Sequence, residues 1–133
     1  MKWTLELAPQ LVSALNRWEL DETERLGERV FRERLVDLAL DALPTDTEEI
    51  LALVAGLPPA LRKAEPRQFG TRVRFSVREK LVRLRPKLRE HDVRGVRVRV
   101  RDVTNAGVYR YLVALGIDVE TEKPRNPETE TMT

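Results

Sequence analysis

Two short stretches of the sequence alternate polar and apolar residues, and a helical pattern follows each. Neighbouring side chains of a strand point to opposite sides, so residues 2–7 and residues 71–77 each predict a strand with one buried face. The apolar positions are Trp3, Leu5 and Leu7 in the first stretch and Val73, Phe75 and Val77 in the second. With the helices between and after them, these strands predict an α+β fold that is mainly helical.

Three helices are predicted between the two stretches. The first starts at Pro9, a residue suited to a first helical turn, and runs into the twenties with apolar residues at steps of one, three and four. The second covers residues 30–43 and is stopped by Pro44. Thr45 or Thr47 is expected to cap the third, whose first turn is acidic.

The second half of the chain continues with a connector and two more helical stretches. Residues 61–70 are expected to form the connector, and residues 78–91 return to helical spacing, although Pro86 must kink or divide that helix. Residues 103–115 predict a last helix, closed by Gly116.

A run of alternating valine and arginine, residues 96–101, precedes the last helix and allows two arrangements. In one, it leads directly into the helix. In the other, it is a genuine strand beside residues 72–77, which makes a basic sheet surface instead of a paired ribbon. Both arrangements leave the arginines facing outward.

The two halves of the sequence repeat each other. A shift of 70 places lays Trp3, Leu5, Leu7, Leu11, Val12, Ala14 and Trp18 on Val73, Phe75, Val77, Leu81, Val82, Leu84 and Leu88. A shift of 68 lays Leu35, Ala39, Leu40 and Leu43 on Val103, Gly107, Val108 and Tyr111. A strand, a helix and a second helix therefore recur together, which indicates an internal duplication.

A strand, a helix, a turn and a second helix with a small residue in its middle resemble the ribbon-helix-helix family. The resemblance covers residues 2–43 and 72–115, and its most family-like stretches are residues 72–77 and 102–112. The family usually turns between its helices with a glycine and a polar cap. Here six alternating residues follow Gly95 before the last helix, so the second turn departs from the family pattern.

This resemblance implies a chain that acts as its own pseudo-dimer. Two strands, one per repeat, would pair antiparallel as a β-ribbon over a helical core and enter the DNA major groove. Similar tandem proteins are accessory DNA binders of conjugative plasmids, and single-repeat relatives are repressors and antitoxins. The expected organisation is residues 1–43 as repeat 1, 44–70 as a linker with a helix, 71–118 as the basic repeat 2, and 119–133 as a disordered tail.

The charge is distributed very unevenly along the chain. Residues 61–110 contain 16 basic and 5 acidic residues, whereas residues 1–60 contain 6 basic and 12 acidic residues. A solvated helix face can accumulate charge without a partner, but a one-signed excess repels itself unless an anion neutralises it. The basic segment therefore favours a nucleic-acid surface.

The strand faces directed away from the core supply the candidate base-reading residues. They are Lys2 and Thr4 from the first strand, and Arg72, Arg74 and Ser76 from the second. A two-stranded ribbon fits the major groove, where arginine can bond to both guanine acceptors. Glu6 lies on the same face and is repelled by phosphates unless it accepts a bond from a cytosine amine. The alternative is an exposed strand edge whose charges prevent aggregation.

Phosphate contacts are expected at the starts of the second helices, where arginine is joined by bare backbone amides. The candidate residues are Arg97, Arg99 and Arg101 in the second half and Arg32 and Arg34 in the first. No aromatic residues are interleaved with these arginines, so duplex binding is favoured over base stacking of a single strand.

Composition and motifs argue against catalysis, and we expect no enzyme activity. The sequence has no cysteine, one histidine, His91, and no glycine-rich phosphate loop, so no catalytic residue, metal site, cofactor or small-molecule substrate is expected. No apolar run approaches the roughly 20 residues that span a bilayer, so we expect no membrane partner and a cytoplasmic location.

The sequence thus predicts a protein that binds specific double-stranded DNA, as a transcriptional repressor or a plasmid accessory factor. Duplex DNA is the expected partner, with a homo-oligomer on the DNA left open. The alternative is a phage or plasmid adaptor that docks an acidic protein through its basic stripe.

Overall fold

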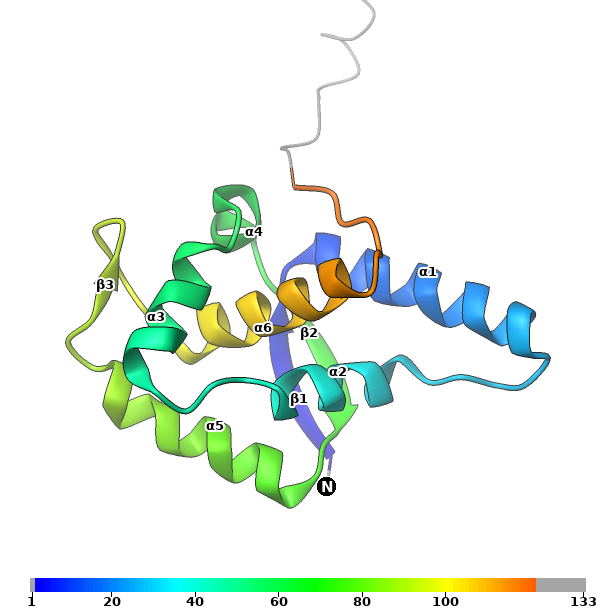
Figure 1. Cartoon of the computed structure of the whole chain (residues 1–133), viewed down its shortest axis with the longest axis horizontal. Helices are drawn as coiled ribbons and strands as arrows, with labels where there is room; N and C mark the ends of the chain where they lie inside the picture. Colours follow the sequence, from blue (N-terminus) through cyan, green and yellow to red (C-terminus); the bar gives the residue numbers. More distant parts are fainter. Residues whose placement is uncertain (1, 122–133) are drawn as a thin grey trace, which may run out of the picture.

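The computed structural model describes residues 2–121, which form a mainly helical α+β structure (Figure 1). The elements are β1 (Lys2–Leu7), α1 (Pro9–Leu26), α2 (Arg32–Asp41), α3 (Thr47–Ala55), α4 (Pro59–Lys63), β2 (Arg67–Arg72), α5 (Phe75–Leu88), β3 (Asp92–Val93), β4 (Val96–Arg97) and α6 (Val100–Ala114). None of these helices is long and apolar enough to cross a membrane.

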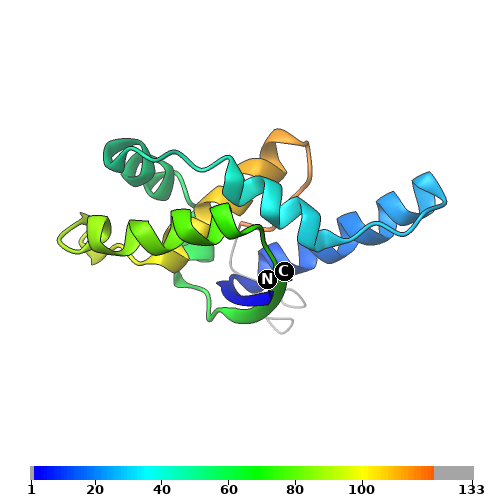
Figure 2. The same cartoon turned by 90° about the horizontal axis from the view of Figure 1, so that it is seen from below.

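A two-stranded antiparallel ribbon, β1 with β2, forms one layer, and the helices cover one side of it (Figure 2). Lys2 pairs with Arg72 at one end, and Leu7 pairs with Arg67 at the other. Because strand side chains alternate, one face of the ribbon enters the core through Leu5, Leu7, Phe69 and Thr71. The predicted first strand is confirmed.

The second strand lies earlier in the sequence than predicted. It ends at Arg72, and Phe75 already begins α5, so a strand over residues 71–77 is wrong. Residues 61–70 are not merely a connector either, because they contain most of β2. The reason is that Val77 starts the buried stripe of α5, which continues through Leu81, Leu84 and Leu88 at helical spacing.

The helices of the first half follow the apolar pattern closely. Helix α1 begins at Pro9 and ends at Gly27, whose φ of 69° gives the left-handed conformation that favours glycine at a helix end. Helices α2 and α3 are also confirmed. The cap of α3 is Asp46 instead of a threonine, and its Oδ2 accepts a bond from the Glu49 amide at 3.3 Å.

Helix α5 is followed by a tight hairpin that interrupts the predicted alternating run. Pro86 lies in the last turn of α5 and does not divide the helix. Strands β3 and β4 are joined by Arg94 and Gly95, which both have positive φ, as a two-residue hairpin turn requires.

The predicted strand over residues 96–101 is present only as Val96–Arg97. Helix α6 begins at Val100, so the alternative of a strand beside residues 72–77 is wrong, and the run leads into the helix. Val98 is buried just before α6, and Val103 is buried in its first turns.

The two halves of the chain pack across each other. Helix α6 packs against β1 of the first half, and α2 packs against β2 of the second half. Helices α2 and α6 also contact each other near Gly107, where an added Cβ would lie 2.6 Å from Leu43 Cδ2. A larger residue at this position would require the Leu43 side chain to move.

Asn105 of α6 fixes the end of β1 to the core. Its Oδ1 accepts a bond from the Ala8 amide at 2.7 Å, and its Nδ2 donates to the Glu6 carbonyl at 2.9 Å and the Arg101 carbonyl at 2.6 Å. The residue is buried, so these bonds satisfy polar groups that water does not reach.

Candidate nucleic-acid interface

The ribbon presents its second face to solvent. The cross-strand pairs on this face are Lys2 with Arg72, Thr4 with Gly70, and Glu6 with Gln68. Thr4, Glu6, Gln68 and Arg72 are exposed. We call these six positions the ribbon face. The alternation that buries Leu5 and Phe69 on one side therefore exposes polar side chains on the other.

An open groove of about 630 Å³ lies along β1, between the ribbon face and the second half of the chain. Thr4, Glu6 and Gln68 of the ribbon face line one side of it. The other side is basic and is lined by Arg85, Arg89, Arg97, Arg99 and Arg101, which we call the basic flank. The ribbon face and the basic flank are thus parts of one continuous surface.

Different elements bring the basic flank together. Helix α5 contributes Arg85, and its C-cap residue Arg89 follows one turn later. Strand β4 contributes Arg97, Arg99 is the N-cap residue of α6, and Arg101 lies in the first turn of α6. Within residues 2–121, Arg101 is the member with an ion pair, at 3.8 Å from Glu6 Oε2. The other guanidinium groups are available to a mobile anion, and their mutual repulsion favours binding one.

The hairpin that carries Arg97 is held in place by Arg62. This side chain is largely buried and donates to the carbonyls of Val93 at 2.6 Å and Val96 at 3.0 Å. It also lies 3.6 Å from Asp102 Oδ2, and the same oxygen accepts the Arg99 amide at 2.9 Å. Arg62 therefore connects the hairpin to the first turn of α6.

The structure brings together some of the predicted contact residues. Arg97, Arg99 and Arg101 all line the groove, and Arg72 lies on the ribbon face with Thr4. Lys2 occupies the register position opposite Arg72. Arg97, Arg99 and Arg101 therefore lie beside the β-ribbon, and the use of this surface for binding stays a prediction.

Two predicted base-reading residues lie off the ribbon. Arg74 caps α5, and its Nε lies 2.7 Å from Asp37 Oδ2 while its Nη2 lies 3.2 Å from Asp41 Oδ2. The hydrogen bond to Asp37 and the charge of Asp37, with a smaller contribution from Asp41, raise the pKa of Arg74 above its usual value. Ser76 is exposed in the first turn of α5. Both follow from the shift of β2, which ends before them.

The predicted phosphate contacts of the first half differ in environment. Arg32 makes a hydrogen bond with Asn16, and its guanidinium lies 4.7 Å from the centroid of the Phe69 ring. Arg34 is exposed on α2. Arg32 therefore contacts the rest of the protein, as Arg101 of the basic flank does through Glu6.

Sequence reasoning missed Arg85, Arg89 and Arg62. A signal for the first two was present, because residues four apart on a helix share a face. The role of Arg62 had no signal, since its partners are 31 and 34 residues away.

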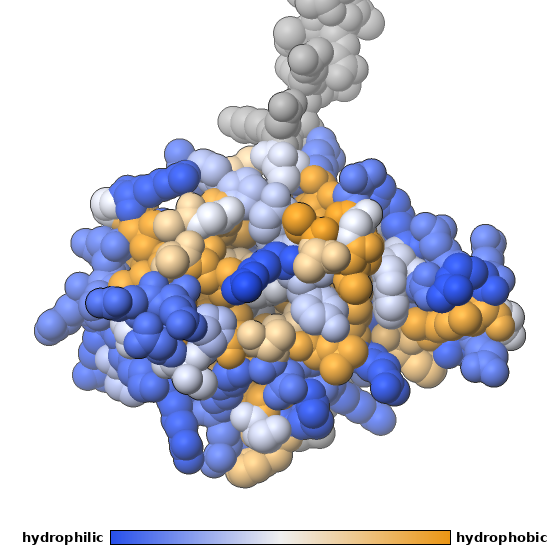
Figure 3. Space-filling model, in the orientation of Figure 1, coloured by the Kyte–Doolittle hydropathy of each residue, from blue (hydrophilic) through white to orange (hydrophobic). Residues whose placement is uncertain are grey.

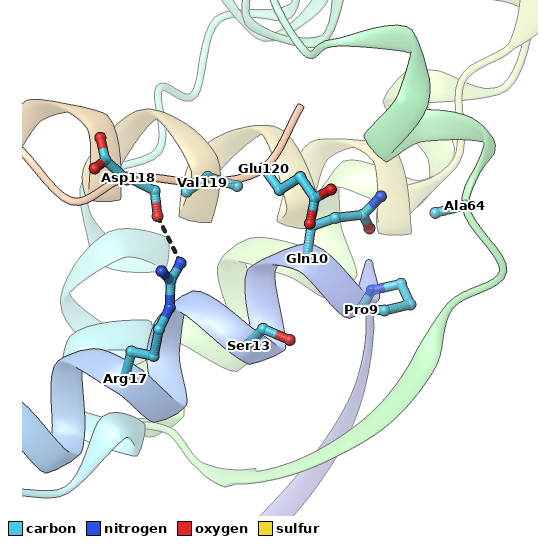
Figure 4. Close-up of a pocket in the computed structure, with 8 residues that line it drawn as sticks. All are labelled: Pro9, Gln10, Ser13, Arg17, Ala64, Asp118, Val119 and Glu120. Carbon is cyan, nitrogen blue, oxygen red and sulfur yellow. Dashed lines mark hydrogen bonds between the residues drawn. The ribbon is translucent and has the colours of Figure 1, made fainter. Parts of the chain in front are cut away.

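A second pocket lies near the start of α1 and involves the end of the described chain (Figure 4). Arg17 Nη2 donates to the Asp118 carbonyl at 3.1 Å. Gln10 Oε1 is buried and has no hydrogen-bond partner among the described residues. Residues 122–133, most of the predicted tail, lie outside the described part. Residues 2–121 also contain no cluster of side chains that could hold a metal ion.

Comparison of the chain with models of protein families, with curated proteins and with solved structures found no match.

Proposed function

We propose that the protein binds double-stranded DNA sequence-specifically, with the ribbon face in the major groove and the basic flank on the phosphate backbone. The observation that carries this proposal is the continuity of an exposed two-stranded ribbon with a groove lined by five arginines. A two-stranded ribbon fits the major groove, and arginine is the usual partner of phosphates beside it.

The relation between the two halves supports a tandem ribbon-helix-helix arrangement. A shift of 66 places lays Leu7, Leu11 and Leu15 on Val73, Val77 and Leu81, all of which are buried. A shift of 68 relates the second helices, where Ala39 of α2 corresponds to Gly107 of α6. Each second helix packs under the strand of the other half, as expected of an intertwined pseudo-dimer.

The side chains of the ribbon face suit the edges of base pairs. Arg72 can donate to O6 and N7 of guanine, Gln68 can make two bonds with adenine, and Thr4 can bond to several bases. Glu6 can accept from the cytosine amine. Each good bidentate contact contributes about 1–3 kcal/mol of discrimination against a wrong base.

The basic flank provides the part of the affinity that depends on salt. If all five arginines contact phosphates, the slope of log affinity against log salt is about −4.5, because each phosphate contributes roughly −0.9. This contribution is independent of sequence, so specificity comes from the ribbon face.

Selection of bound sequences from a pool of random duplexes tests the proposal. We expect a recurring sequence, bound with the salt slope given above. Arg72→Ala should lower affinity for the selected duplex by about 1–3 kcal/mol while leaving the fold intact. Arg110→Ala, the same loss of charge at an exposed position on α6, is the matched control and should have little effect.

Absence of any duplex binding at low salt would refute the proposal. It would favour the second function, an adaptor that binds an acidic protein through the same basic flank. Duplex binding that is equal for wild type and Arg72→Ala would remove the ribbon as the reader of the sequence.

A further inference from the structure

The two sides of the ribbon have opposite charge. Residues 17–33 and 83–101 occupy corresponding places, because each runs from the later part of a first helix to the first turn of a second helix. Residues 17–33 contain six acidic and four basic residues, whereas residues 83–101 contain two acidic and eight basic residues. The net charge is therefore −2 on the first side and +6 on the second.

The difference extends to the starts of the second helices. At α2, the Arg32 amide donates to Glu19 Oε2 at 2.7 Å, so the chain's own carboxylate occupies the place where an anion would bind. The residue that corresponds to Glu19 in the second half is Arg85, which lines the basic groove beside Val100 at the start of α6. The carboxylate of Glu19 thus corresponds to the guanidinium of Arg85, while the start of α6 has its own carboxylate, Asp102, on the Arg99 amide.

The two ends of the molecule also differ in how polar their surfaces are. The end of α1 and the β3–β4 hairpin lie at opposite ends of the longest axis (Figure 2). On the helical face, an apolar strip crosses the end of α1, whereas the α5 side is mainly hydrophilic (Figure 3). Leu20, Leu26 and Phe31 are the exposed apolar residues of this first end.

The two halves of the ribbon face carry different side chains at corresponding positions. Positions related by the shift of 66 are Lys2 and Gln68, Thr4 and Gly70, and Glu6 and Arg72. A carboxylate thus corresponds to a guanidinium, and the two prefer different base edges. A palindromic site presents identical edges and phosphates to both halves, so it cannot satisfy both halves of this chain.

We propose that the DNA target lacks two-fold symmetry and is bound in one orientation, with phosphate contacts concentrated on the side of the basic flank. This inference rests on the proposed function and names the kind of duplex that the site selects. The acidic side remains without backbone contacts, because Asp21, Glu24 and Glu28 would repel phosphates there.

Ethylation interference on the duplex recovered by selection tests this inference. We expect phosphates that block binding to lie on one side of the centre of the recognised sequence, and the sequence itself to lack dyad symmetry. Arg85→Ala with Arg89→Ala should weaken binding roughly 60-fold at 0.1 M salt and make the salt slope about 1.8 units shallower, since two phosphate contacts are lost. The double variant Lys63→Ala with Arg110→Ala, also exposed, is the control for charge loss and should change affinity little.

The reverse experiment uses Asp21→Lys with Glu28→Lys on exposed positions of the acidic side. This variant should bind more tightly, with a slope about 1.8 units steeper if both lysines contact phosphates, and with new interfering phosphates on the opposite side of the sequence. Interfering phosphates placed equally on both sides in the wild type, or a palindromic selected sequence, would overturn the inference. If only the inference of an asymmetric site fails, a duplex is still selected and Arg72→Ala still weakens binding to it. If the proposed function itself fails, no duplex is selected.

Discussion

Replacement of Asn105 by alanine should destabilise the protein far more than an exposed polar substitution normally does. The variant loses three hydrogen bonds and leaves the amide of Ala8 and the carbonyl of Glu6 without their partner at the buried end of β1. A typical hydrogen bond contributes about 0.5–1.5 kcal/mol, and an unsatisfied buried group costs about 1–3 kcal/mol. Alanine recovers roughly 0.5 kcal/mol through its helix propensity. The expected net loss in the free energy of unfolding is about 2–4 kcal/mol.

Urea denaturation followed by circular dichroism measures this loss. With an m value of about 2 kcal/mol/M, the unfolding midpoint should fall by roughly 1–2 M. Asn16→Ala is the matched control, because Asn16 is exposed on α1 and its bond with Arg32 is open to water, where a substitution typically changes stability by about 0.5 kcal/mol or less. A loss for Asn105→Ala no larger than that of Asn16→Ala would refute the role of Asn105.

Three further predictions follow from individual contacts. Arg74→Ala should lower stability slightly without changing the ribbon, because Arg74 pairs with Asp37 and Asp41. Denaturation measures the loss of stability, and duplex titration of the same variant measures any loss of affinity. A large loss of duplex affinity at unchanged stability would contradict this assignment. Gly107→Val should lower the free energy of unfolding by about 1–3 kcal/mol, because the valine side chain meets Leu43. Gly56→Val, at the exposed end of α3, is the control and should lower it less. Equal losses of stability at both positions would argue against the close approach of α2 and α6. The hydrogen bond from Arg25 lowers the pKa of Glu22. The stabilisation from this pair is therefore present at neutral pH and is lost as the pH falls through the lowered pKa. An NMR titration of Glu22 with an ordinary midpoint would show that the pair does not form in solution.

The helices of the first half could be predicted from the sequence because their apolar spacing is local. Pro9, Gly27 and the acidic first turn of α3 mark helix ends by their own backbone and charge preferences. The antiparallel pairing of two distant strands was also predicted, although the position of the second strand was wrong.

The error in β2 has a simple geometric origin. The predicted repeat has a shift of 70, whereas α1 and α5 begin 66 residues apart, at Pro9 and Phe75. The difference of four residues is close to one helical turn and is an even number of strand residues, so it preserves both apolar patterns. Only the packing of Phe69 and Thr71 into the core distinguishes the two alignments.

Part of the candidate site could also be predicted from the sequence, and part could not. Arg97, Arg99 and Arg101 were predicted because they are close together in the sequence and precede a helix. The pairing of Arg74 with Asp37, and the support of the hairpin by Arg62, depend on contacts between distant parts of the chain. No local pattern reports such contacts.

Chemical protection of the selected duplex tests whether the ribbon face occupies the major groove. Dimethyl sulfate methylates guanine N7 in the major groove and adenine N3 in the minor groove, so it reports which groove the protein occupies. With the ribbon face in the major groove, guanine N7 atoms within the recognised sequence should be protected while adenine N3 atoms stay reactive. Unprotected N7 atoms in the fully bound duplex, or protection of adenine N3 alone, would contradict the account.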